Sequence, residues 1–388
     1  MSPAPTEARR PTYRGGALAA DGVRPAPAAP AADGRPGARV NELDLLRFLA
    51  ALAVVLFHYA FRGYAADGLS PMPYPLLAPL ARYGYLGVDL FFLISGFVIL
   101  MSAAGGGLRQ FVVSRAVRLY PAFWACCTLS FVAIVAFGGE RFSATPGQYL
   151  LNLTLLGGFL GVPPIDGVYW SLFVEMKFYA LVAIVLVAGL MPRVQTLLVL
   201  WLAATCALAV LPVGILRALL IADYAPYFIA GALCYLVWAE GPSPLRLGGI
   251  AVAWLLALYQ SMTAIDEFAR HYQRELDGRV IAGTITVFFA GMLLIATRRT
   301  GRLGRRRWLT LGALTYPLYL LHQKIGYLIF NAAYPALDAH LVLWGTLLLM
   351  LLAAYAVHVL VERRLGARLK RLLTAPRPAP LARAPRAS

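Results

Sequence analysis

Two side chains suited to acid–base and anion chemistry lie in one long apolar stretch near the start of the sequence. Leu43 to Phe61 is about long enough to cross a membrane, yet it contains Arg47 and His58. Ionisable groups inside a membrane span are costly, so each is a candidate functional residue. Arg47 and His58 are eleven residues apart, which returns them to nearly the same helical face, roughly 16 Å apart along the axis. This arrangement predicts a site for a long polar ligand.

Both residues also have structural interpretations. Arg47 lies close enough to the beginning of the segment for its guanidinium to reach the membrane interface. His58 precedes Tyr59 and could be an interfacial aromatic residue. Because both residues lie on one face of the helix, the functional interpretation of the pair is favoured.

A second apolar segment contains GVDLFFLISGF at 87–97, which adds Asp89 and Ser95. Asp89 is expected at a depth similar to that of His58. A carboxylate beside an imidazole raises its basicity and fixes its tautomer, as a general base requires. We therefore expect Asp89 to orient His58. The alternatives are an acid favoured by the helix dipole and, for Ser95, close helix packing.

Arginines occur three residues apart in the next stretch, at Arg115 and Arg118. On a helix they are neighbours, and two guanidinium groups there could bind phosphate groups bidentately. The alternative is ordinary positive charge at the inner membrane surface.

Later segments contribute Glu175, in WSLFVE at 170–175, and Tyr316 and His322, in YPLYLLH at 316–322. Buried polar groups need partners, so we suggest a contact between Glu175 and His322. The four cysteines have no metal-site spacing and are expected to be structural, and no metal site is predicted.

Composition places the chain among polytopic helical membrane proteins. It has 388 residues, of which 60% are hydrophobic and 14% are charged. The net charge of +17 does not indicate nucleic acid binding, because basic residues concentrate in the tails and short connections.

Residues 1–40 are rich in proline and alanine and are predicted to be a disordered cytoplasmic tail. A membrane domain is predicted over 41–362 and a basic cytoplasmic tail over 363–388, which we expect to contact anionic lipids. The sequence predicts an all-α fold with about ten membrane-spanning segments: 43–61, 84–103, 117–138, 168–189, 195–213, 224–239, 246–263, 280–297, 310–331 and 341–362.

The run Tyr149–Leu160 is too short to span and is predicted to be re-entrant or interfacial. Arginines crowd the connection 298–308 and follow the last segment, whereas the connection 264–279 has mixed charge. Since positive residues favour the inside, both termini are predicted to be cytoplasmic.

The chain resembles the acyltransferase-3 family of integral membrane O-acyltransferases in five motifs. These are the R-x10-H pattern of Arg47 and His58, GVDLFFLISGF, RAVRLYP at 115–121, WSLFVE and YPLYLLH. These motifs occur in the family's order, over about residues 41 to 362. The WSLFVE segment departs from the family at Met176 and Lys177, where a second acid and Gln are usual.

The resemblance implies a bacterial cytoplasmic membrane enzyme that transfers an acyl group, by default acetyl, from acyl-CoA to a hydroxyl of a sugar or glycosylated molecule. For such a reaction we expect catalytic roles for His58, Asp89 and Glu175, and phosphate binding by Arg115, Arg118 and Arg47. No permanently bound cofactor is expected. A transporter that uses Arg47, Asp89, Glu175 and His322 is the alternative.

Overall fold

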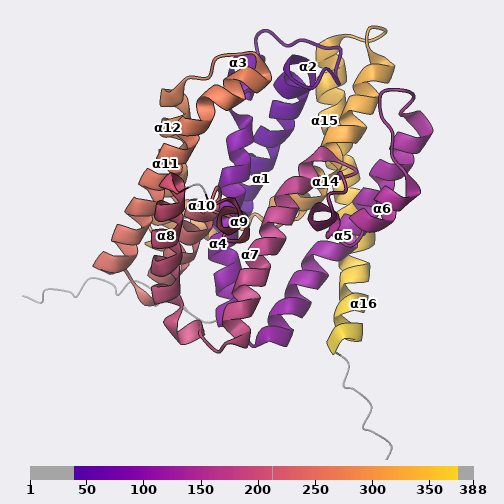
Figure 1. The fold of residues 1–388 in the computed structure, drawn as a ribbon. Helices are drawn as coiled ribbons and strands as arrows, with labels where there is room; N and C mark the ends of the chain where they lie inside the picture. The colour runs from indigo at the N-terminus through magenta and orange to yellow at the C-terminus, as the bar shows by residue number, and fades with distance from the viewer. Residues whose placement is uncertain (1–38, 212, 375–388) are drawn as a thin grey trace, which may run out of the picture. The chain divides into compact units, whose positions relative to one another are not determined.

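The computed structural model describes residues 39–211 and 213–374. Within these ranges it contains helices and loops and no strand, which confirms the all-α prediction. The predicted tail over 1–40 and the end of the predicted tail over 363–388 lie mostly outside the described residues. The principal helices, shown in Figure 1, are α1 (Asn41–Phe57), α4 (Gly87–Ala104), α5 (Leu108–Phe137), α6 (Pro146–Asn152), α7 (Trp170–Val187), α8 (Val194–Val210), α9 (Gly214–Leu219), α10 (Ala225–Glu240), α11 (Pro244–Tyr272), α12 (Gly278–Ala296), α14 (Leu309–Ala333), α15 (Ala339–Val357) and α16 (Arg363–Thr374).

Each of the ten predicted apolar segments falls on a helix. Eight helical segments in the described part of the chain are long and apolar enough to cross a membrane. The other two are α10, which has 16 residues, and α14, whose apolar run is interrupted by polar side chains between Thr315 and Lys324. The long apolar helices indicate an integral membrane protein.

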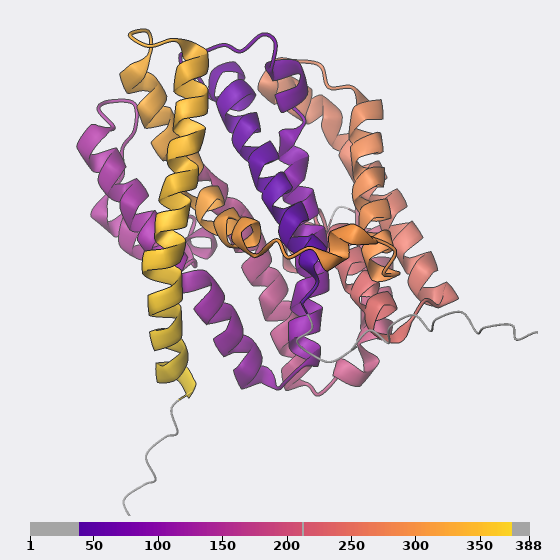
Figure 2. The same cartoon turned by 180° about the vertical axis from the view of Figure 1, so that it is seen from behind.

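Helix α1 packs on α4 and α14. In Figure 2 it is seen in indigo between α15 and α12. Gly87 permits the close approach of α4, because a Cβ there would lie 2.6 Å from the carbonyl oxygen of Ala50. At His58 the α-helix changes to a π-helical turn, η1 (His58–Arg62). Such turns often occur at functional sites.

Helices α4 and α10 approach even more closely. A Cβ on Gly231 would lie 1.9 Å from the carbonyl oxygen of Leu93, and one on Gly96 would lie 2.1 Å from that of Phe228. Small residues permit this backbone contact inside a membrane. The contact also fixes the rotation of α4 about its own axis.

The connection predicted over 264–279 is partly helical, because α11 continues to Tyr272. Its last turns are held by aromatic contacts, with ring centroids 5.2 Å apart for Tyr85 and Phe268 and 5.5 Å apart for Phe61 and Tyr272. The run Tyr149–Leu160 contains the end of α6 and a 3₁₀ turn (Gly157–Leu160).

The C-terminal basic residues are also helical as far as the structure describes them. A π-helical turn, η6 (His358–Glu362), joins α15 to α16. Helix α16 packs beside α5, where a guanidinium nitrogen of Arg109 donates to the carbonyl oxygen of Leu373 at 2.9 Å.

Candidate functional site

His58 is buried at the junction of α1 and η1 and faces a second histidine. Only 5% of His58 is exposed, and His322 of α14 is fully buried. His58 Nδ1 lies 2.8 Å from the carbonyl oxygen of Val54 and 3.1 Å from His322 Nε2. Sequence reasoning selected both histidines, but it did not pair them.

The expected pairing of Asp89 with His58 is wrong. Gly87 faces α1, and a residue two positions later points about 200° away around the helix. Asp89 therefore faces α10, where its carboxylate is hydrogen-bonded to Tyr227.

The suggested contact of Glu175 with His322 is also wrong, because His322 bonds His58. Glu175 Oε1 accepts hydrogen bonds from Ser95 Oγ at 2.9 Å and from the Tyr179 hydroxyl at 2.8 Å. Helices α4 and α7 thus bring two predicted residues, Ser95 and Glu175, together. The third residue of this group, Tyr179, was not singled out in the sequence, although it is one helical turn from Glu175.

Arg47 and Arg118 line a cavity of about 590 Å³ at the N-terminal end of α1. The cavity also includes Arg39, Asp44 and His358. Three arginines in one concave site give it the charge and the donors to bind an anion such as phosphate. The sequence indicated two of these arginines but gave no reason to select His358, which lies near the end of an apolar segment.

Glu175 connects this cavity with the interior of the bundle. Its carboxylate and that of Asp44 both interact electrostatically with the Arg47 guanidinium. The Arg118 guanidinium lies 3.9 Å from Glu362, whose other oxygen is 2.7 Å from His358 Nδ1. The cations of the cavity are therefore held by carboxylates from several helices.

Arg115 has different partners from the other two predicted arginines. Its guanidinium donates to Ser114 Oγ at 2.9 Å and to Ser102 Oγ at 3.4 Å. Tyr316 lies closer to the cavity, with the Arg118 guanidinium 5.9 Å from its ring centroid and its hydroxyl donating to the carbonyl oxygen of Leu119 at 3.3 Å.

Asp166 is a fully buried acid near His322 that sequence reasoning missed. It accepts the Lys324 N–H at 2.9 Å and the Val168 N–H at 3.2 Å, so it attaches the loop before α7 to α14. Burial raises the pKa of the Asp166 carboxyl to about 6, although both N–H groups oppose the rise. Its position just before a helix signals an N-cap, but burial is a tertiary property that this signal does not reveal.

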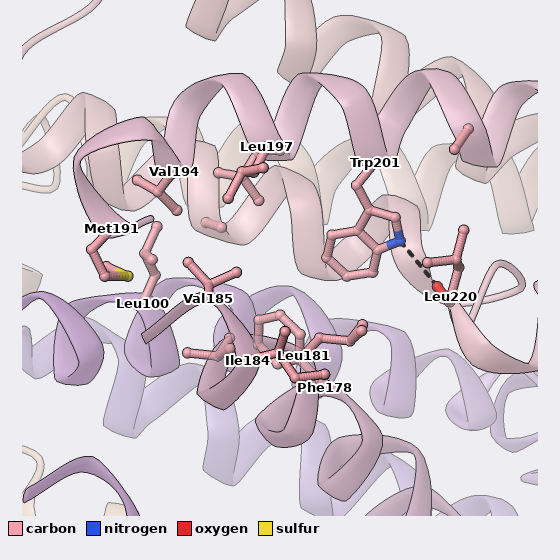
Figure 3. A pocket seen from close by; sticks show the side chains of 14 residues that line it. Leu100, Phe178, Leu181, Ile184, Val185, Met191, Val194, Leu197, Trp201 and Leu220 are labelled. Carbon is pink, nitrogen blue, oxygen red and sulfur yellow. Dashed lines mark hydrogen bonds between the residues drawn. The ribbon is translucent and has the colours of Figure 1, made fainter. Parts of the chain in front are cut away.

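A different cavity, of about 270 Å³, lies between α7 and α8 (Figure 3). Its lining, from the described residues, contains no charged side chain, and the Trp201 N–H already donates to the carbonyl oxygen of Leu220 at 3.0 Å. This cavity therefore has no group for acid–base chemistry.

Comparison with known proteins gives a family match over most of the chain. A family model described as an acyltransferase domain matches residues 40–362. No solved structure matches the chain.

Three curated relatives align with parts of the chain. "Nodulation protein 10" of Rhizobium leguminosarum bv. viciae is 29% identical over 36% of this chain and 42% of the relative. "Putative peptidoglycan O-acetyltransferase YrhL" of Bacillus subtilis (strain 168) is 29% identical over 38% of this chain and 24% of the relative. "O-acetyl transferase" of Shigella phage Sf6 is 28% identical over 37% of this chain and 45% of the relative. The alignments thus span less than half of the length of each relative.

Proposed function

This chain belongs to the acyltransferase family whose domain it matches, and on that premise we propose that it is a membrane O-acyltransferase. The donor is acyl-CoA, with acetyl as the default acyl group, and the acceptor is a hydroxyl of a sugar, glycan or glycosylated small molecule. Two of the three relatives carry O-acetyltransferase names, which supports the acetyl assignment. The proposed location is the bacterial cytoplasmic membrane, with both termini in the cytoplasm.

The observation that carries this proposal is the arrangement of charge along α1. The arginine-lined cavity lies at one end of the helix and the buried His58 lies at the other. The eleven residues from Arg47 to His58 correspond to roughly 16 Å. An acyl-CoA matches this arrangement, because it has phosphates at one end and a thioester at the other end of a long pantetheine arm.

In the proposed complex Arg47 and Arg118 bind the CoA phosphates. Arg115 is not assigned to phosphate binding, because its guanidinium is hydrogen-bonded to Ser114 and Ser102. Glu175, with its hydrogen bonds from Ser95 and Tyr179, holds Arg47 electrostatically from the interior side of the cavity.

His58 acts at the thioester end as the general base. The acceptor hydroxyl gives its proton to the imidazole while its oxygen forms a bond to the acyl carbonyl carbon. The carbon–sulfur bond then breaks, and the departing CoA thiolate takes the proton back from the imidazolium. The reaction yields the ester and free CoA, and His58 returns to its neutral form.

The test uses purified protein in lipid nanodiscs with acyl-labelled acetyl-CoA. We expect release of free CoA and transfer of label to a carbohydrate extract, with both lost in His58→Ala. A His271→Ala variant, with its change in a peripheral histidine at the end of α11, is the matched control. The proposal is wrong if His58→Ala folds normally and retains the wild-type rate, or if the protein in liposomes drives gradient-dependent uptake and processes no acyl-CoA.

A further inference from the structure

The proposed reaction uses His58 as the general base but gives no role to His322, the second buried histidine beside it. His58 is the first residue of η1, directly after α1, and His322 lies in α14; their ring centroids are 5.0 Å apart. A second imidazole so close to the proposed base needs a physical account, because most buried polar side-chain atoms have a hydrogen-bond partner. The proton positions follow from the partners of each ring.

His322 has one ring nitrogen whose protonation is fixed by its surroundings. Its Nδ1 lies 2.8 Å from the carbonyl oxygen of Tyr319 and 3.2 Å from that of Leu318. Carbonyl oxygens only accept hydrogen bonds, so Nδ1 carries the hydrogen. In the neutral ring, Nε2 is then an acceptor.

The same reasoning applies to His58. Its Nδ1 faces the carbonyl oxygen of Val54 at 2.8 Å and His322 Nε2 at 3.1 Å, and both partners are acceptors. Nδ1 therefore carries a hydrogen that is shared between them. This leaves Nε2 of His58 with its lone pair, which is the form that a general base needs.

We infer that His322 is a positioning residue that orients His58 and stabilises its imidazolium. When His58 takes a proton on Nε2, the positive charge also appears on Nδ1–H. The lone pair of His322 Nε2 points at that group, so this hydrogen bond strengthens as the charge develops. His322 does not touch the substrate and keeps its own proton throughout.

The backbone around His322 is held in a way that suits this role. The hydroxyl of Tyr59, next to His58, donates to the carbonyl oxygen of His322 at 2.8 Å. Two residues further along α14, Asp166 accepts a hydrogen bond from the Lys324 N–H at 2.9 Å. These bonds tie α14 to η1, which also carries His58, and to the loop before α7, which limits movement of the His322 ring relative to His58.

The inference rests on the proposed function, and the test separates the two. Turnover, acetyl-CoA affinity and thermal stability are compared for wild type, His322→Gln, His322→Asn and His322→Leu. The glutamine amide reaches about as far as Nε2 and can present an acceptor to His58, whereas the asparagine amide reaches only about as far as Nδ1. His340→Leu, an exposed histidine of α15, is the control and should leave every value unchanged.

We expect His322→Leu and His322→Asn to lower kcat by about 10²-fold or more, within the range that general acid–base catalysis supplies. Acetyl-CoA affinity should stay unchanged, and His322→Gln should recover at least ten-fold of the loss. In a His58→Ala background, His322→Leu should cost nothing further, because the two residues act as a unit.

The inference is overturned if His322→Leu keeps the wild-type kcat, if the glutamine variant loses as much as the asparagine variant, or if the two losses add in the double variant. Should the leucine variant unfold, the comparison of glutamine with asparagine still decides. An inactive wild type would instead refute the proposed function.

Discussion

Replacement of Asp166 by Asn should change how the stability of the protein depends on pH. The carboxyl is fully buried, and its pKa of about 6 in the folded state lies above the ordinary value of 3.8. Each pKa unit corresponds to about 1.36 kcal/mol, so ionised Asp166 costs the folded state about 3 kcal/mol relative to the protonated acid.

The sign follows from proton binding. Below pH 3.8 Asp166 is protonated in both states, and its contribution to stability is complete. As pH rises through the folded pKa of about 6, that contribution is lost, because the folded state must give up a proton that it binds more tightly. Asparagine resembles the protonated acid at every pH. The stability of wild type relative to Asp166→Asn should therefore fall by about 3 kcal/mol between roughly pH 4 and pH 7.

The assay is thermal unfolding in detergent, followed by tryptophan fluorescence at half-unit steps of pH. The absolute difference at one pH also contains the loss of an acceptor for the Lys324 N–H, so its change with pH is the decisive quantity. Asp277→Asn is the matched control. Asp277 caps α12, and the N–H and guanidinium of Arg279 lower its pKa, so its variant should lose stability relative to wild type as pH rises. A wild-type to Asp166→Asn difference that stays constant from pH 4 to pH 7 would refute the reasoning.

Three further outcomes can be measured. Gly231→Ala should destabilise the protein by about 1–3 kcal/mol, because its Cβ would meet the Leu93 carbonyl oxygen, while Gly248→Ala, with no atom within 4 Å, should be tolerated in the same thermal assay. Arg118→Gln should weaken acetyl-CoA binding by about ten-fold or more in equilibrium titration, as expected for a lost charge-assisted hydrogen bond, and unchanged affinity would exclude it from the phosphate site. Asp89→Asn should keep kcat within about three-fold of wild type, because its carboxylate bonds Tyr227 and not His58. A loss as large as that of His58→Ala would contradict this and favour the expected role of Asp89 in orienting His58.

Much of the fold is readable from the sequence because membrane helices obey a local rule. A segment of about twenty apolar residues must satisfy its backbone internally, so composition and length predict a helix without knowledge of its neighbours. Eight segments of the described residues are helices of this kind, and the two others, α10 and α14, are helical as well. The predicted boundary near residue 264 is wrong because α11 is extended by aromatic contacts from other segments.

The candidate site divides in the same way. The cost of ionisable groups in apolar stretches selected Arg47, His58, Glu175 and His322. The structure places Arg47 at the cavity, His58 and His322 in the buried interior, and Glu175 in a partly buried position where Ser95 and Tyr179 bond it. Asp166 was not selected from the sequence, because it precedes an apolar segment and is buried only by the packing of its loop.

The sequence by itself determined which residues are unusual, the helices that carry them and their spacing along α1. The tertiary structure alone decided which residues meet. Helical periodicity gives the angle between two side chains of one helix, but the neighbour that each side chain faces depends on how the helix is rotated in the bundle. Gly96 and Gly231 bring α4 into close contact with α10, which turns Asp89 toward Tyr227. His58 is thereby left to meet His322 of α14, 264 residues further along the chain.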